Sequence, residues 1–525
     1  MAQALNPNFD WEPEEGGANK WLVLISIMIG TFMASLDSTI VTVAFPKMMA
    51  TFGVSIDKIE WVMTAYLMAF AVVLPSSGWI ADRFGHKLTY ILGLILFTVG
   101  SMACSFSQNE SFLIAFRVFQ GVGAGFLTPV GMAIVTRTFP PRQRGLALGI
   151  RSIASAASMS LGPLFGGYLV DNYPWHSIFD INIPVGIIGI IAVVVLQDEY
   201  KSHIKEKFDI GGFITMSIGL GALLLAFSTG NSSWNTGGWH STFIFTNFFI
   251  AAVCLIAFIT IEMNKKHPIL NLKILKYHNF GLATLILFIF GVAFFGNSFL
   301  LPLFLQNSLG YTAFQAGLVF LPVGILQAFV APLSGQFTDR FNPKIPLFTG
   351  AIILGITMYL FSFFSLQTMH GQIMLPLYLR GLGMGLFFAP LSAIALNDIP
   401  RPQLAQASSL FTTVRQIGGS FGIAALGTIL TERVKFHAQI YSEQLRQGSP
   451  QYNQVMDHLK NFAMHATGSS SINGQHYAKM MLLNNIKSQA YVQGINDDFL
   501  IGAVLTFSLL IPMLLLKTRK KKLNR

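Results

Sequence analysis

The segment SGWIADRFGHK, residues 77–87, is a short charged stretch between two long apolar parts of the chain. A closely similar segment, SGQFTDRFNPK, occupies residues 334–344. A charged segment that recurs about half a chain later predicts that the protein contains two related halves.

A second pair of motifs repeats with a similar separation. Arg117 begins RVFQGVGAG at residues 117–125, and Arg380 begins RGLGMG at residues 380–385. Each motif follows one copy of the charged segment at a comparable distance. Two landmarks with similar offsets indicate a duplication of the chain.

The composition is that of an integral membrane protein. Of 525 residues, 53% are hydrophobic and only 11% are charged, which excludes an ordinary soluble protein. The net charge of +11 comes largely from short loops beside apolar stretches and from the tail KTRKKKLNR, residues 517–525. We therefore expect contact with membrane lipids, a cytoplasmic tail and no nucleic-acid partner.

Other classes of function leave no trace in the sequence. Cys104 and Cys254 both lie in apolar runs, so neither a disulfide framework nor a metal site is expected. The polar, acidic start lacks the pattern of a signal peptide, so we expect the first helix to remain uncleaved. With no nucleotide or HExxH motif, we expect no enzyme activity and no cofactor, and energy from a proton gradient.

The apolar stretches predict an all-α polytopic membrane protein with fourteen transmembrane helices. The even number and the excess of Lys and Arg on one side place both termini in the cytoplasm. Matching the halves gives six helices, an inserted pair and six more. The expected helices lie at residues 21–44, 59–80, 88–107, 111–136, 145–170, 181–197, 209–229, 241–262, 279–301, 314–337, 345–364, 372–396, 404–431 and 496–516.

This pattern divides the chain into five parts. The divisions are a cytoplasmic segment at residues 1–20, a six-helix half at 21–197, a two-helix linker at 198–278, a six-helix half at 279–516 with an outer loop at 432–495, and a basic tail at 517–525.

Four motifs, in order along the chain, resemble those of the major facilitator superfamily, and within it the fourteen-span drug:proton antiporters. They are LDSTIVTVAFPKM at residues 36–48, GWIADRFGHK at 78–87, RVFQG at 117–121 and SLGPLFGG at 160–167. The resemblance covers nearly the whole chain. It implies the major facilitator fold, with two pseudo-symmetric halves, and proton-coupled export of amphipathic drugs or other toxic hydrophobic compounds across the inner membrane by alternating access. Uptake of a small metabolite by the same fold, or a non-transporting membrane receptor, remains open.

Asp37 is the leading candidate for proton coupling, as the only carboxylate deep inside a predicted span. Helix geometry places it in the outer third of the membrane, where Arg117 also lies. Burial favours the neutral acid and a nearby cation favours the carboxylate, so a change in their separation would capture or release a proton. Asp37 serving only to pin helices together, and Arg117 snorkelling to the interface, are the alternatives.

Polar residues inside spans are candidates for a substrate cavity. Gln120 follows Arg117, Arg380 is its counterpart in the second half, and Arg415 lies near mid-membrane. Together with Asp37, these residues are predicted to face the cavity, although packing roles are an open alternative.

The repeated charged segments resemble the cytoplasmic latch of the family, and simple topology-setting loops are the alternative. The second copy carries Asn342 and Pro343 in place of a glycine and a histidine, which implies an asymmetric latch. The latch candidates are Asp82, Arg83, Gly85, Lys87, Asp339 and Arg340.

SLGPLFGG resembles the antiporter motif of the family, which accompanies export. Gly162 and Pro163 break helical hydrogen bonding, and Gly166 and Gly167 permit close backbone approach, so a bent, tightly packed helix is expected. A packing kink without a role in direction is the alternative.

The outer loop at residues 432–495 is long and mostly polar, with helical spacing at 452–466. Family members of double-membrane bacteria carry a comparable loop and work with a periplasmic membrane-fusion adaptor and an outer-membrane channel. The resemblance implies these partners, and a solvated cap over the pore is the alternative.

Overall fold

The computed structural model describes residues 19–54, 56–140, 142–200, 208–230, 234–265, 268–298, 300–400, 403–445, 450–467 and 471–517. The regular structure within these ranges is helical throughout, as the sequence predicts. The first half comprises α1 (Lys20–Phe52), α2 (Ile56–Phe84), α3 (His86–Ser105), α4 (Glu110–Thr138), α5 (Arg144–Asn172), α6 (Ser177–Asp180) and α7 (Asn182–Leu196). The inserted segment comprises α8 (Ile210–Thr229), η2 (Gly238–His240), α9 (Thr242–Asn264) and η3 (Leu272–Lys276).

The second half begins with a helix that is interrupted by a π-helical turn. Its elements are α10 (His278–Ser298), α11 (Leu300–Leu303), η4 (Phe304–Ser308), α12 (Ala313–Val319), α13 (Leu321–Arg340), α14 (Lys344–Phe361), α15 (His370–Asn397), α16 (Leu404–Gln444), α17 (Pro450–Thr467), α18 (Ser471–Ser508) and α19 (Leu510–Leu515).

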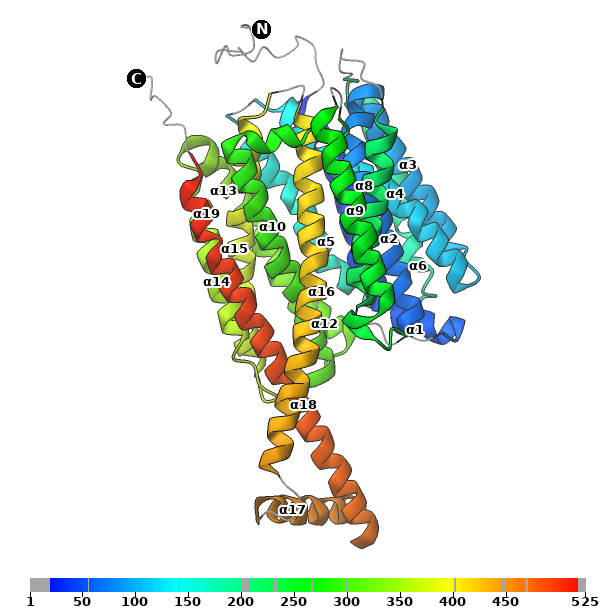
Figure 1. Cartoon of the computed structure of the whole chain (residues 1–525), viewed down its shortest axis with the longest axis vertical. Coiled ribbons are helices and arrows are strands. Elements are labelled where there is room, and N and C mark those ends of the chain that lie inside the picture. The colour runs from blue at the N-terminus through cyan, green and yellow to red at the C-terminus, as the bar shows by residue number, and fades with distance from the viewer. Residues whose placement is uncertain are drawn as a thin grey trace.

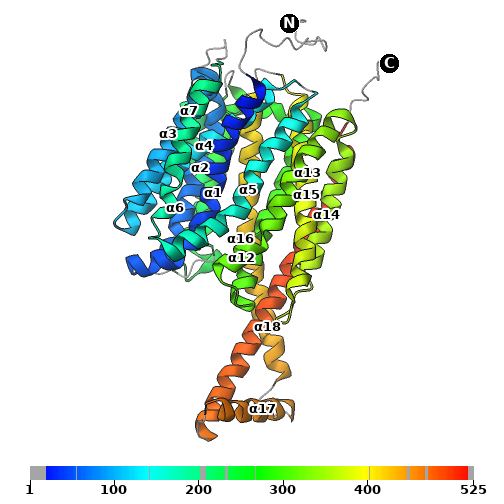
Figure 2. The same ribbon diagram turned by 180° about the vertical axis from the view of Figure 1, so that it is seen from behind.

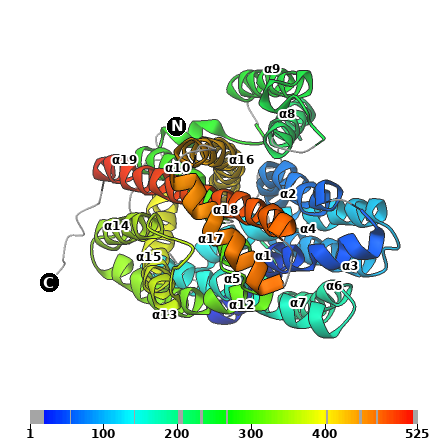
Figure 3. The same cartoon turned by 90° about the horizontal axis from the view of Figure 1, so that it is seen from below.

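The two halves stand side by side as one bundle (Figure 1). α1 begins and α19 ends at the same end of the bundle, which agrees with an even number of crossings (Figures 1 and 2). Seen along the bundle, α8 and α9 lie outside the two halves (Figure 3). The halves meet where α5 packs along α13 and α2 packs along α16.

Local sequence signals set several helix ends. The Asn109 side chain accepts a hydrogen bond of 2.9 Å from the backbone N–H of Phe112 and so caps the start of α4. Gly53, with φ of 66°, ends α1 in the left-handed conformation that glycine adopts without strain. Such end signals let several predicted spans agree with the observed helices to within a few residues.

Thirteen helices in the described ranges are long and apolar enough to cross a membrane, whereas the sequence predicts fourteen. The difference is α16, which runs the length of the bundle but is less apolar than the others (Figure 1). Its sequence SSLFTTVRQIGGS places hydroxyl groups and a charge in the middle of the helix. These residues lie on a helix that packs against both halves, so burial against protein replaces contact with lipid.

The region predicted as an outer loop, residues 432–495, is largely helical where it is described, and α17 coincides with the helical spacing predicted at residues 452–466. α16 continues to Gln444, and α18 begins at Ser471, well before the predicted start of the last span. α17 lies across the far end, so these segments form a helical stalk that projects from the bundle (Figure 1). Met456 of α17 packs with Ala478 and Leu482 of α18, which gives the stalk a small apolar core of its own.

Candidate functional site

Asp37 and Arg117 form an ion pair in the interior of the first half. Asp37 lies on α1 and Arg117 on α4, and both side chains are fully buried. Arg117 Nη1 is 2.5 Å from Asp37 Oδ2, its Nε donates to the carbonyl of Val62 on α2, and its guanidinium lies 4.1 Å from the Tyr66 ring centroid. A buried pair with several further partners is held in one geometry.

The other Asp37 oxygen completes a polar network. Oδ1 accepts hydrogen bonds from Gln120 Nε2 at 3.0 Å and from Asn182 Nδ2 at 3.2 Å. Both amides also donate to Ser101 Oγ, at 3.2 and 3.0 Å. The network therefore joins α1, α3, α4 and α7, and only its Asp37, Arg117 and Gln120 members are predicted from the sequence.

This geometry ties the charge of Asp37 to the position of Arg117. An ionised Asp37 accepts bonds from three side chains, whereas a protonated carboxyl would lose its charge and one acceptor site. Arg117 would then be a buried cation without a counterion, which is costly. Uptake of a proton by Asp37 thus requires Arg117 to move or to find another partner.

The second half lacks this pair. Arg380 on α15 is 2% exposed, and its Nη2 donates to Ser298 Oγ on α10 at 2.8 Å. Its guanidinium lies 4.5 Å from the Phe294 ring centroid, and its Nη1 is buried with no hydrogen-bond partner in the described part of the chain. Arg117 is paired with the carboxylate of Asp37 on α1, whereas Arg380 is hydrogen-bonded to the hydroxyl group of Ser298 on α10.

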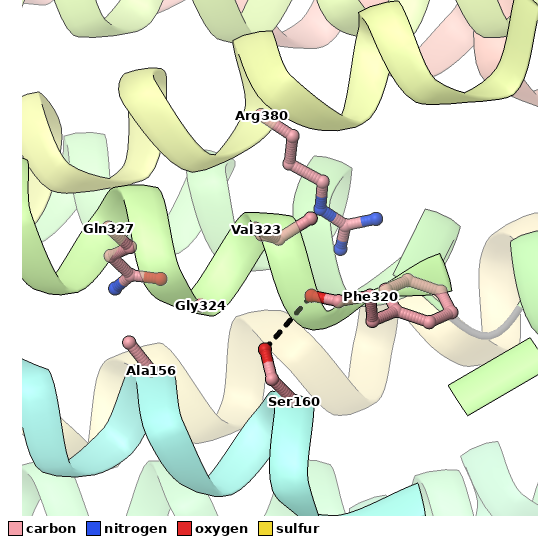
Figure 4. Close-up of a pocket in the computed structure, with 7 residues that line it drawn as sticks. All are labelled: Ala156, Ser160, Phe320, Val323, Gly324, Gln327 and Arg380. Carbon is pink, nitrogen blue, oxygen red and sulfur yellow. Dashed lines mark hydrogen bonds between the residues drawn. The ribbon is translucent and has the colours of Figure 1, made fainter. Parts of the chain in front are cut away.

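Arg380 lines a cavity of about 30 Å³ between α5 and α13 (Figure 4). A space of this size holds about one water molecule. The other lining residues are Ala156, Ser160, Phe320, Val323, Gly324 and Gln327, and Ser160 Oγ donates to the carbonyl of Phe320 at 2.9 Å. Of the four residues predicted to face a substrate cavity, only Arg380 lines this one.

Arg415 is partly exposed on α16. Its neighbourhood includes Arg151, which was not among the predicted site residues. Arg415 interacts electrostatically with Arg151 of α5, which is 9% exposed and donates from Nη2 to the carbonyl of Thr128 at 3.1 Å. Two arginines from different halves thus lie within range of each other's electrostatic repulsion. Arg151 lies inside a predicted span, and a charged residue in such a position is the signal that could have identified it.

Two further carboxylates, at the edges of predicted spans, are also buried. Asp37 is not the only buried one, because Asp498 is fully buried on α18 and Glu262 is 2% exposed on α9. Both Asp498 oxygens are buried without a hydrogen-bond partner among the described residues. The sequence does not reveal the burial of Asp498 because this residue falls near the expected edge of the last span.

The charged segments lie at the end of the bundle opposite the stalk. Asp339 bridges the halves, since its two carboxylate oxygens each accept a hydrogen bond of 2.9 Å from the backbone N–H groups of Gly145 and Leu146 at the start of α5. An anion at a helix N-terminus is favourable. A Cβ on Gly335 would overlap the carbonyl oxygen of Gly145, so the two backbones also touch.

The first charged segment makes contacts in its own half and also approaches the second half, since a Cβ on Gly78 would lie 3.0 Å from the carbonyl oxygen of Ala405 on α16. Asp82 lies 3.7 Å from His86, and Lys87 Nζ donates to the carbonyls of Val194 and Gln197 at the end of α7. Gly85 has a φ of 114°, which requires a residue without a side chain. The side chains of the remaining candidates, Arg83 and Arg340, are exposed.

We expect Asp339→Asn to slow turnover about tenfold while leaving substrate binding within about twofold of the wild type, since it weakens two charge-assisted hydrogen bonds that hold the halves together. Single-turnover export and equilibrium binding would be measured in parallel. Faster backbone hydrogen exchange at Gly145 and Leu146 is the structural readout. Lost binding in a folded protein would place Asp339 in the binding site.

The glycines of SLGPLFGG bring α5 close to helices on two sides. Gly162 lies against Thr39 of α1, and Gly167 lies against Phe314 of α12. Pro163 contacts Gly317, also on α12, and Gly166 packs on Ile40. The motif therefore connects the helix that carries Asp37 with the second half.

Comparisons with known proteins agree with this architecture. The family model of the Major Facilitator Superfamily matches residues 27–423. The fatty acid resistance protein FarB of Neisseria gonorrhoeae is 31% identical over 506 residues, which are 96% of this chain and 97% of FarB. The multidrug export protein EmrB of Haemophilus influenzae is 30% identical over 502 residues, 95% of this chain and 96% of EmrB. The crystal structure of the human organic anion transporter MFSD10 (TETRAN) shares the fold, with a TM-score of 0.59 at 13% identity over 96% of this chain and 100% of MFSD10.

Proposed function

The chain belongs to the major facilitator superfamily of transporters, and we propose on that premise that it exports amphipathic drugs or other toxic hydrophobic compounds across the inner (cytoplasmic) membrane in exchange for protons. The buried Asp37–Arg117 pair is the observation that carries this proposal. In this orientation both termini, and the contact of Asp339 with α5, lie on the cytoplasmic side.

The exchange proceeds by alternating access. With Asp37 ionised and paired to Arg117, the first half keeps one packing of α1, α3, α4 and α7. Protonation of Asp37 from outside removes the counterion of Arg117 and favours a different packing, which opens the path to the cytoplasm. Release of the proton there restores the pair.

One proton per cycle is sufficient for useful export. Moving one charge through 100 mV supplies about 2.3 kcal/mol, which supports a concentration ratio of roughly 50 for a neutral substrate. The names of EmrB and FarB support export over uptake of a small metabolite. The buried ion pair supports transport over a receptor, because a receptor has no need for a proton-coupled charge inside its bundle.

Purified protein in proteoliposomes tests the proposal. A proton gradient, acidic on the side that corresponds to the outside of the cell, is expected to move fluorescent amphipathic dyes out of the opposite compartment, and a protonophore is expected to stop this movement. Dye movement together with protons, in the same direction, would indicate uptake. No movement of any compound in a broad panel would favour the receptor.

We also propose that the stalk binds a periplasmic membrane-fusion adaptor that leads to an outer-membrane channel. Its exposed large apolar side chains support a partner, because a helical hairpin that only joined two spans would not need them. These side chains are Phe436, Phe462, Tyr477, Met480 and Leu483.

Deletion of residues 446–486, with a short Gly/Ser linker between the remaining helices, is expected to lower the drug resistance of whole cells about tenfold or more. Dye export in proteoliposomes should stay within about twofold of the wild type, because the deleted segment lies outside the bundle. The deletion removes the apolar core of the stalk as a unit, so it leaves little of that core exposed. Equal losses in cells and in vesicles would instead indicate a cap that acts on the pore itself.

A further inference from the structure

The space between the two halves holds positive charge without a matching negative charge. Arg151, Arg380 and Arg415 are buried or partly buried, and none of them forms an ion pair with a carboxylate in the described ranges. Burial of a charge without a partner is costly, and natural proteins retain it mainly where a ligand or a switch uses it.

Arg151 and Arg380 each have one buried guanidinium nitrogen without a described hydrogen-bond partner, and of the three arginines it is Arg380 that lines the cavity between α5 and α13. Its Nη2 donates to Ser298 Oγ and its guanidinium lies over the ring of Phe294, but its Nη1 is buried with no described hydrogen-bond partner. The side chain reaches from α15 into the cavity between α5 and α13, toward Val323, Phe320 and Ser160 (Figure 4). The cavity thus combines a cation with neutral polar groups.

Arg151 and Arg415 extend the positive charge along the same space. Arg151 precedes Ser160 on α5 by nine residues. Helix geometry therefore puts Arg151 about 13 Å nearer the end of the bundle where α5 begins. Arg415 approaches it from α16. On the proposed orientation, an anion that enters from the cytoplasm meets this pair before it reaches Arg380.

A cationic substrate has no counterpart in this region. Asp37 is fully buried, and its two oxygens already accept hydrogen bonds from Arg117, Gln120 and Asn182. It therefore offers no free negative charge to the cavity. Among the described residues between the halves, the deep charges that lack a counterion are those of arginines.

Aromatic side chains beside Arg380 suit an apolar tail. Phe294, under the guanidinium, stacks on Phe290 at 5.0 Å between ring centroids, and Phe290 stacks on Phe387 of α15 at 4.5 Å. Phe388 lies 5.1 Å from Phe290. A cation next to an aromatic cluster matches a molecule with one charged end and one hydrophobic end.

We propose that the exported compounds are anionic amphiphiles, whose carboxylate or comparable acidic head binds Arg380 between α5, α13 and α15. This inference rests on the proposed export function and names its substrate class. The guanidinium presents parallel N–H donors that fit a carboxylate. Because the cavity is only about 30 Å³, the site accepts the substrate when α13 moves away from α5. The close contact of Gly324 with Ser160 and with the carbonyl of Ala156 marks the surface that must open.

Three compounds with unbranched tails of similar length and different heads test the proposal: octanoate, 1-octanol and octyltrimethylammonium. Their binding to the protein in lipid nanodiscs would be measured by calorimetry near neutral pH, where the carboxyl group is ionised. Empty nanodiscs correct for partition into lipid. Octanoate is expected to bind about 10- to 100-fold more tightly than either of the others, the range of a charge-assisted hydrogen bond. Equal binding of the three, or preference for the cation, would overturn the proposal.

Variants locate the site. Arg380→Gln is expected to remove the preference for octanoate, and Arg380→Lys is expected to restore part of it, because the charge returns without the planar fork. Arg142→Gln, the same change at an exposed position, should bind octanoate as the wild type does. If Arg380→Gln fails to fold, the head-group preference of the wild-type protein still decides the substrate class. Unchanged preference in a folded Arg380→Gln protein would place the anion elsewhere.

The two proposals fail in distinguishable ways. Octanoate binding that depends on Arg380, without any proton-driven export, would remove the export function and leave the anion site. Proton-driven export of cations in a protein that does not prefer octanoate would remove the anion site and leave the export function.

Discussion

Proton-coupled export is expected to fall at least about 100-fold when Asp37 is replaced by asparagine, because the amide cannot carry the proton that drives exchange. The variant should also lose about 3–5 kcal/mol of stability, since Arg117 remains buried without its counterion. Export would be measured in proteoliposomes under an imposed pH gradient, and stability would be followed by thermal unfolding in detergent.

The double variant Asp37→Asn, Arg117→Gln separates the two effects. Removal of both charges is expected to restore most of the stability and none of the proton coupling. Asp497→Asn is a matched control, because Asp497 pairs with Arg433 at a partly exposed position near the stalk. Wild-type export by a stable double variant would show that the proton is carried elsewhere, with Asp498 as the next residue to test.

Gly335→Val is expected to reduce export by roughly 100-fold, because its side chain would overlap the backbone of Gly145 when the end of the bundle opposite the stalk is closed. No rotamer change relieves a clash with backbone. An overpacking cost of about 3 kcal/mol lowers the population of the closed state by roughly 100-fold. The first turn of α5 should then exchange its amide hydrogens faster, since Asp339 no longer protects Gly145 and Leu146.

Gly221→Val is the matched control for this substitution. Gly221 also lies within a helix, but an added Cβ there has no neighbour within 4 Å, so export should stay close to that of the wild type. Normal export by Gly335→Val would mean that the contact between Gly335 and Gly145 is not part of the transport cycle.

Hydrophobicity makes most of the fold predictable. A segment such as α7, with the sequence NIPVGIIGIIAVVVL, is too apolar for a helix exposed to water and is therefore predicted as a membrane span. α16 is predicted as a span from its apolar residues although its composition is mixed. In the stalk, the helical spacing at residues 452–466 predicts α17, whereas the continuation of α16 and the early start of α18 were missed, because polar helices that pack mainly on each other carry a weak periodic signal.

The site is only partly predictable. Asp37 and Arg117 stand out as charges in apolar spans, and their contact follows from similar depth in the membrane. Asn182 and Ser101 are common polar residues, and only the tertiary structure shows that both reach one carboxylate network. The same applies to Arg151 and Arg415, whose proximity depends on how α5 and α16 of different halves are placed.

The unbroken course of α16 gives the molecule a mechanical property. This helix of 41 residues touches α2 near its start, where Ser409 donates to the carbonyl of Leu74, and it ends in the stalk. It measures about 60 Å, so a tilt of about ten degrees sweeps its far end through about 10 Å. A lever of this kind turns the rocking of one half into a stroke outside the membrane. Any protein held at α17 would be pushed and released once in every cycle.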